Sequence, residues 1–111
     1  MKGFIVNATL VAPPERLTAA FRQLADDWRA GTRYLSSTTD IAMHPAYQRI
    51  IGIGPQVIPL ILTELAKQPE PWFWALTALT GEDPVPATDK GRVRAMADAW
   101  LKWGRENGWI A

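Results

Sequence analysis

Residues 44–62, HPAYQRIIGIGPQVIPLIL, decide the fold of this 111-residue chain. The stretch contains the chain's only histidine, two glycines that are two residues apart, and a dense apolar run. Gly52 or Gly54 can take the left-handed conformation that ends a helix, and Pro55 suits the first turn of the next one. Beyond this point, apolar residues recur at helical spacing: Ile58, Ile61, Leu62 and Leu65. We therefore interpret GIGP as a corner between two packed helices.

The alternative interpretation of GIG is a loop that holds a phosphate. A Walker loop needs a Gly-Lys-Ser/Thr ending after a strand, and a dinucleotide loop needs a third glycine after a strand. Here a helical pattern precedes the glycines and a proline follows them. The sequence therefore predicts no phosphate-binding loop and no cofactor at this corner.

Other segments of the chain show helical periodicity as well. One stripe follows Pro13-Pro14, with Gly31 as its expected end, and the stretch 72–81, WFWALTALTG, is a further helical segment. The two apolar stripes at the ends of the chain consist of Leu17, Phe21, Leu24 and Trp28, and of Val93, Met96, Trp100 and Trp103. Short loops marked by prolines predict antiparallel helical hairpins. We expect residues 1–12 to form an N-terminal arm and residues 13–111 to form one all-α domain.

Composition narrows the class of protein. The formal net charge of +1 argues against strong electrostatic binding of nucleic acid, which needs a clustered basic face. The chain has no cysteine, so disulfides and thiolate chemistry are excluded, and no metal site is predicted. No apolar run approaches the ~18 residues of a membrane span. We expect a cytoplasmic protein with no membrane partner.

Residues 50–81 resemble a HEAT-type pair of helices. The resemblance rests on IIGIGPQVIPLILTEL followed by PWFWALTALTGEDP, and the tail WLKWGRENG resembles a W-x-x-W closing helix found after some bacterial repeats of this type. The combination HPAYQRIIGIG, WFWAL and TGEDPVP also resembles a family of small bacterial proteins of uncharacterised function. The first resemblance implies a truncated, HEAT-like α–α superhelix, because a true solenoid needs at least three repeats. The second resemblance implies no activity and no catalytic residue.

Titratable residues give two candidate clusters. His44 could act with Asp40, Tyr47 or Glu82 in a small enzyme, but helix capping is the leading interpretation because the chain offers no second histidine or cysteine. Glu82 and Asp83 follow a predicted helix end, where negative charge opposes the helix dipole. We expect them to form ion pairs or a charged patch with Arg92 and Arg94.

Six tryptophans are a large number for a chain of this length. Trp28, Trp100 and Trp103 lie on apolar stripes and are expected in the core. Trp72 and Trp74 point about 200° apart on a helix, so both cannot face one core. The expected interaction surface is therefore Trp72, Phe73, Trp74, His44 and Tyr47.

The leading functional expectation is a non-enzymatic protein–protein interaction module. It would be one member of a small two-gene, toxin–antitoxin-like pair, or a subunit that associates with itself. A nucleic-acid-associated regulator is the first alternative, and a small enzyme centred on His44 is the second.

Overall fold

The computed structural model describes residues 15–111, and within that range every regular element is helical. The α-helices are α2 (Glu15–Thr32), α3 (Thr38–Ala42), α4 (Pro45–Ile53), α5 (Ile58–Lys67), α6 (Phe73–Thr80) and α7 (Val93–Glu106), and two short 3-10 helices are η1 (Pro55–Val57) and η2 (Ala87–Asp89). The all-α prediction is confirmed. The expected arm at residues 1–12, and the prolines expected to open the first helix, lie outside the described residues.

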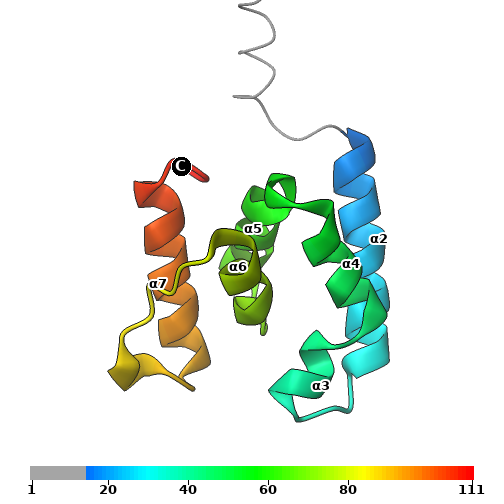
Figure 1. Cartoon of the computed structure of the whole chain (residues 1–111), viewed down its shortest axis with the longest axis horizontal. Coiled ribbons are helices and arrows are strands. Elements are labelled where there is room, and N and C mark those ends of the chain that lie inside the picture. Colours follow the sequence, from blue (N-terminus) through cyan, green and yellow to red (C-terminus); the bar gives the residue numbers. More distant parts are fainter. Residues whose placement is uncertain (1–14) are drawn as a thin grey trace, which may run out of the picture.

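The helices form a bundle whose main contacts join second neighbours in the helix order. α2 and α4 run antiparallel and are linked through α3, while α6 packs on α4 and α5 packs on α7 (Figure 1). α5 and α6, the pair that resembles a HEAT unit, touch each other, but each makes more extensive contact with another helix. The HEAT-like arrangement therefore stays a prediction.

The corner after α4 forms as the glycines and prolines predict. Gly54 has a φ of 103°, which side chains rarely tolerate, and it caps α4 through its N–H to the Ile51 carbonyl. Pro55 then begins η1, which leads into α5. Gly52 lies inside α4, so Gly54 alone makes the bend. The chain bends by 103° between the segments Pro45–Ile53 and Pro55–Lys67.

Gly31 does not end α2, contrary to the sequence-based expectation, because the helix continues to Thr32. Its role is a close approach: a Cβ added at Gly31 would lie 2.3 Å from Nε2 of His44. The imidazole is held there by its own cap, since its Nδ1 accepts a hydrogen bond of 3.1 Å from the Ala46 N–H. A glycine in α2 thus gives room for the side chain that begins α4.

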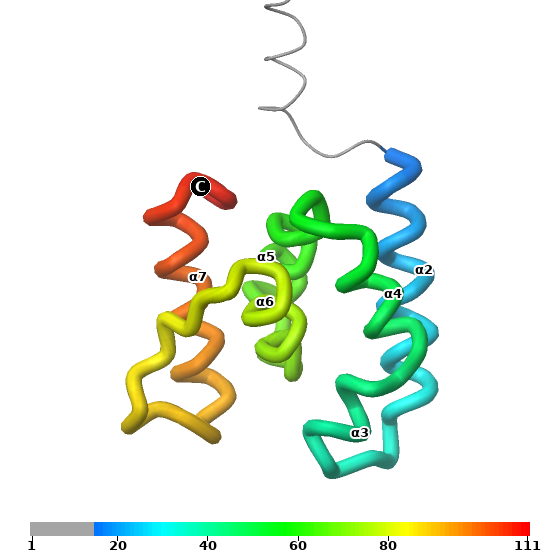
Figure 2. Tube along the Cα trace, in the orientation of Figure 1, coloured from blue at the N-terminus to red at the C-terminus, as the bar shows by residue number. Residues whose placement is uncertain are grey.

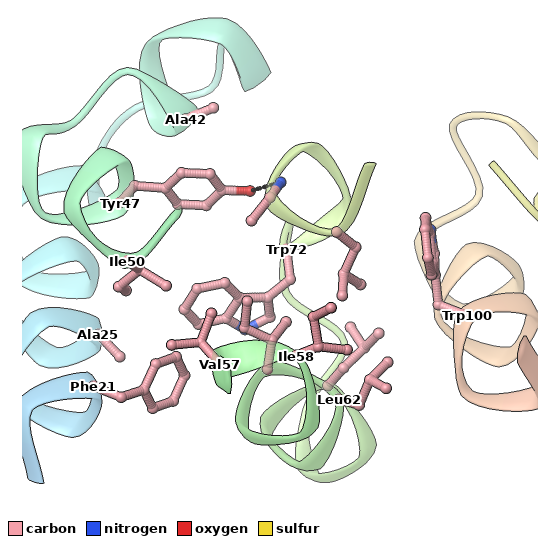
Figure 3. Close-up of a cluster of buried hydrophobic side chains, with 14 of the residues drawn as sticks. Phe21, Ala25, Ala42, Tyr47, Ile50, Val57, Ile58, Leu62, Trp72 and Trp100 are labelled. Atoms are coloured by element: carbon pink, nitrogen blue, oxygen red, sulfur yellow. Dashed lines mark hydrogen bonds between the residues drawn. The ribbon is translucent and has the colours of Figure 1, made fainter. Parts of the chain in front are cut away.

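Trp72 lies at the centre of the core, between side chains of α2, α4 and α5 (Figure 3). Its ring centroid is 4.4 Å from that of Trp28 and 5.7 Å from those of Phe21 and Tyr47. The Trp72 indole N–H is buried without a hydrogen-bond partner in the described part of the chain. Trp28, Trp100 and Trp103 are also buried, as predicted.

Within residues 15–111, no single helix has both the length and the apolar character needed to cross a membrane. By length and composition, only the bent pair made of α4 and η1–α5 meets that test.

Candidate functional site

A groove with a volume of about 650 Å³ opens between α3 and the start of α7. Figure 2 shows α3 with its flanking turns and the start of α7 at the same end of the molecule, opposite the C-terminus. Phe73, Trp74 and Thr77 of α6 form the floor, and Val93 and Met96 of α7 form much of one wall. The lining is mostly apolar, and the Trp74 side chain is exposed there, with 45 % of the residue accessible.

The α3 wall of the groove is fixed by hydrogen bonds from the two helices beside it. The indole N–H of Trp28 donates to the Ile41 carbonyl at 3.0 Å, and the Gln48 amide donates to the Ala42 carbonyl at 2.7 Å. Ser37 caps the helix by accepting from the Asp40 N–H. These contacts explain how a five-residue helix keeps a defined position.

The floor of the groove is positioned by Tyr47. Its hydroxyl accepts a hydrogen bond from the Ala75 N–H, drawn as the dashed line in Figure 3, and donates one to the Pro71 carbonyl, both at 3.0 Å. α6 has no side-chain cap at Trp72, so this hydroxyl satisfies one of the free N–H groups of its first turn. Burial raises the pKa of Tyr47 well above its ordinary value, although the hydrogen bond from Ala75 opposes that shift.

The loop wall of the groove contains a charged pair. Asp83 accepts hydrogen bonds from the Lys90 ammonium and, at 3.2 Å, from the Val85 N–H. These two bonds, that of Lys90 first, hold the pKa of Asp83 below its ordinary value. The Gly91 N–H contacts the sulfur of Met96 at 3.3 Å, which joins this loop to α7.

Behind the groove, an arginine ties α2 to the segment that precedes α6. Arg29 donates to both carboxylate oxygens of Glu70, at 2.8 and 2.7 Å, and to Glu64 at 2.8 Å. The Glu70 hydrogen bond is the main reason why the pKa of Arg29 is raised. Burial alone would raise the pKa of Glu64, but hydrogen bonds from Arg29 and Lys67 outweigh it and lower that pKa.

The structure separates the residues expected to form one interaction surface. Trp74 is exposed and Phe73 is half-buried, and both line the groove. Trp72 and Tyr47 were placed on this surface wrongly: each is 0 % exposed, because α4 and α6 turn these rings toward Trp28. His44 is half-buried against Gly31 and caps α4, as the leading interpretation predicted.

The expected ion pairs form with other partners. Asp83 pairs with Lys90, and Arg92 pairs with Asp89 at 3.5 Å. Glu82 accepts a hydrogen bond of 3.2 Å from the Trp103 indole N–H, which ties the loop to α7. Arg94 is exposed on α7 and joins none of these contacts. The cation that pairs with Asp83 therefore comes from the loop before α7 and not from that helix.

The side chains considered for catalysis are not joined in one cluster. Across residues 15–111, no hydrogen bond links His44 to Asp40, Tyr47 or Glu82, and the Tyr47 hydroxyl is committed to two backbone groups. The same residues contain no group of three His, Asp or Glu side chains placed to hold a metal ion.

The sequence pattern does not indicate the roles of several residues at the site. Val93 and Met96 lie on the same apolar stripe as the buried Trp100 and Trp103, yet Val93 is 44 % exposed. Nothing in the sequence around Arg29 indicates its partners Glu64 and Glu70, which lie more than 30 residues away in the chain.

Comparison of the chain with models of protein families, with curated proteins and with solved structures finds no match in any of the three.

Proposed function

We propose that the chain is a non-enzymatic protein–protein interaction module that binds its partner in the groove over α6. The observation that carries the proposal is the exposed Trp74 ring on the floor of a mostly apolar groove of about 650 Å³. Exposed aromatic side chains gathered at a groove are typical of protein interfaces, where tryptophan is among the residues that contribute most to binding.

The build of the groove supports this proposal. Its walls and floor come from helices that are held by hydrogen bonds from Trp28, Gln48 and Tyr47. A groove whose shape exists before binding loses less entropy when a partner docks. We place this module in the cytoplasm, on the lack of cysteine.

Site-specific photo-cross-linking in intact cells tests the proposal. A photoreactive amino acid replaces Thr77, which is exposed in the groove, or Gln56, which is exposed in η1 as a control. We expect a discrete protein adduct from position 77 and none from position 56. No adduct from position 77, the same adducts from both positions, or an adduct only with nucleic acid would contradict the proposal.

A further inference from the structure

The large hydrophobic side chains that are exposed within residues 15–111 gather at one end of the molecule. They are Tyr34, Leu35, Met43, Trp74 and Val93, with exposures of 91, 45, 47, 45 and 44 %. Tyr34 and Leu35 lie in the turn before α3, Met43 directly follows α3, and Trp74 and Val93 line the groove. Figure 2 shows α3 and the start of α7 at the same end of the molecule. We call these five residues the apolar end.

The apolar end extends beyond the groove. A small molecule in the groove would cover Trp74 and Val93 but would leave Tyr34, Leu35 and Met43 in water. With ~200 Å² for a large side chain, the exposed parts amount to on the order of 500 Å² of apolar surface. That matches the apolar part of a stable protein interface, which buries ~800 Å² per partner. Another protein surface is therefore a better occupant than a small ligand.

The charges around the apolar end are of both signs and mostly paired. Lys90 pairs with Asp83, and Arg92 pairs with Asp89. The remaining charged residues of the flanking segments are Arg33, Asp40 and Arg94. A strongly acidic or basic partner finds no excess of opposite charge here, whereas two identical surfaces with balanced charge do not repel each other.

The same surface contains both a protrusion and a groove. Tyr34 has 91 % of its surface exposed in the turn before α3, and Thr38 and Ala42 of α3 line the groove. A two-fold dimer needs a surface that is complementary to itself, and a protrusion beside a groove meets that need. We infer that a second copy of this chain docks here, with the turn at Tyr34–Leu35 of each copy in the groove of the other.

This inference rests on the proposed function and names the partner. The chain's own residues 1–14 are a poorer occupant, because they join α2 at Glu15, about 27 Å along that 18-residue helix from the apolar end. Reaching it would take roughly eight of these residues in a fully extended form and would leave only about six to cover the surface.

Sedimentation equilibrium of the full chain measures the dimer and its dissociation constant. We expect the wild type to dimerise, Tyr34→Ser and Trp74→Ala each to raise the dissociation constant about tenfold or more, and Gln56→Ala to change it less than about twofold. Tyr34 is almost fully exposed, so its variant keeps the fold and carries the test even if Trp74→Ala does not fold.

Mixing the two variants gives the sharpest version of the test. Each variant homodimer is damaged at both reciprocal contacts, whereas a mixed dimer has one intact contact, with Tyr34 of one chain in the groove of the other, and one contact that lacks both side chains. Losses at residues that touch each other are not additive, so removing both side chains from one contact costs less than the sum of the two single losses. We therefore expect the mixture to associate more tightly than either variant alone. A mixture that associates no more tightly would overturn the reciprocal docking.

The failure of this inference is distinguishable from the failure of the proposed function. A wild-type chain that stays monomeric up to millimolar concentration overturns the second copy as the occupant. If position 77 then cross-links to a different protein in cells, the groove is still an interaction site. If it cross-links only to residues 1–14 of the same chain, or to nothing, both proposals are wrong.

Discussion

The guanidinium of Arg29 holds the Glu70 carboxylate with two hydrogen bonds, of 2.8 and 2.7 Å. This pair joins α2 to the segment that ends at Pro71, and Pro71 lines the groove. A third bond, to Glu64 at 2.8 Å, adds α5 to the same network. The ion pair therefore fixes the segment that enters α6 and supports the groove from behind.

We predict that Arg29→Met lowers the free energy of unfolding by about 2–3 kcal/mol. Removing one member of a buried pair costs 3–5 kcal/mol, and the partial exposure of Arg29 reduces that figure. Arg29→Lys keeps the charge but loses the two-pronged geometry, so it is the matched control and should lie between the variant and the wild type. Urea unfolding followed by circular dichroism measures all three.

The pH dependence of this effect has a defined sign. The pKa of Glu64 is held below its ordinary value of 4.5, so its contribution to stability is present above pH 4.5 and is lost as the pH falls through the lower folded value. The stability difference between wild type and Arg29→Met should therefore shrink in acid. A difference that is constant from pH 7 to pH 3 would show that the carboxylates are not the partners that matter.

Tyr47→Phe should lower the free energy of unfolding by about 2 kcal/mol. The change keeps the ring but leaves the Ala75 N–H and the Pro71 carbonyl without the hydroxyl that satisfies them. Thermal melting measures the loss. Amide hydrogen-exchange rates should increase most in the first turn of α6. An unchanged melting temperature would mean that water replaces the hydroxyl.

The same tyrosine predicts a loss of stability in alkali. Burial raises the folded pKa of Tyr47 above the ordinary 10.0, so the neutral phenol contributes stability that is fully present below pH 10 and is lost as the pH rises further. The wild type should lose stability above pH 10 more steeply than Tyr47→Phe. Parallel curves for the two proteins would contradict this assignment.

The contact of His44 with Gly31 predicts a dependence between two substitutions. Glycine to alanine inside a helix normally stabilises by about 0.5–1 kcal/mol. At Gly31 the new methyl group would collide with the imidazole, which caps α4, so the gain should vanish or reverse. In a His44→Ala background the ordinary gain should return. A double-mutant cycle with a coupling energy near zero would show that the imidazole moves aside freely.

Two tryptophans two residues apart should respond very differently to alanine. Trp72 is fully buried among aromatic rings, so Trp72→Ala should cost about 3–5 kcal/mol. Trp74 is half-exposed over the groove, so Trp74→Ala should cost about 1 kcal/mol or less and leave the fold intact. Equal losses of stability would place Trp74 in the core and remove the main support for an interaction face.

Local sequence chemistry predicts much of the helix pattern. Gly54-Pro55 marks the bend, the His44-Pro45 step predicts the cap of α4, and the apolar spacings identify α5 and the buried tryptophans of α7. Gly31 was misinterpreted because its role is to give room to His44, which lies 13 positions further along the chain. Helix spacing contains no information on that contact.

The site is only partly predictable for the same reason. Helix geometry correctly separates Trp72 from Trp74, but it cannot say which of the two rings faces the core. Tyr47 and Arg29 find partners 24 to 41 residues away, so their roles depend on tertiary packing. The exposure of Tyr34 and Val93 likewise depends on how α3 and α7 are placed in the fold.

Hydroxyl-radical footprinting of tryptophan tests the central claim, that the groove over α6 is covered by another protein surface. Trp74 is compared with Trp109, which is half-buried near the C-terminus, at the opposite end of the molecule. We predict that the oxidation of Trp74 relative to Trp109 falls several-fold in intact cells compared with the dilute purified chain. An equal ratio in the two conditions would contradict the account.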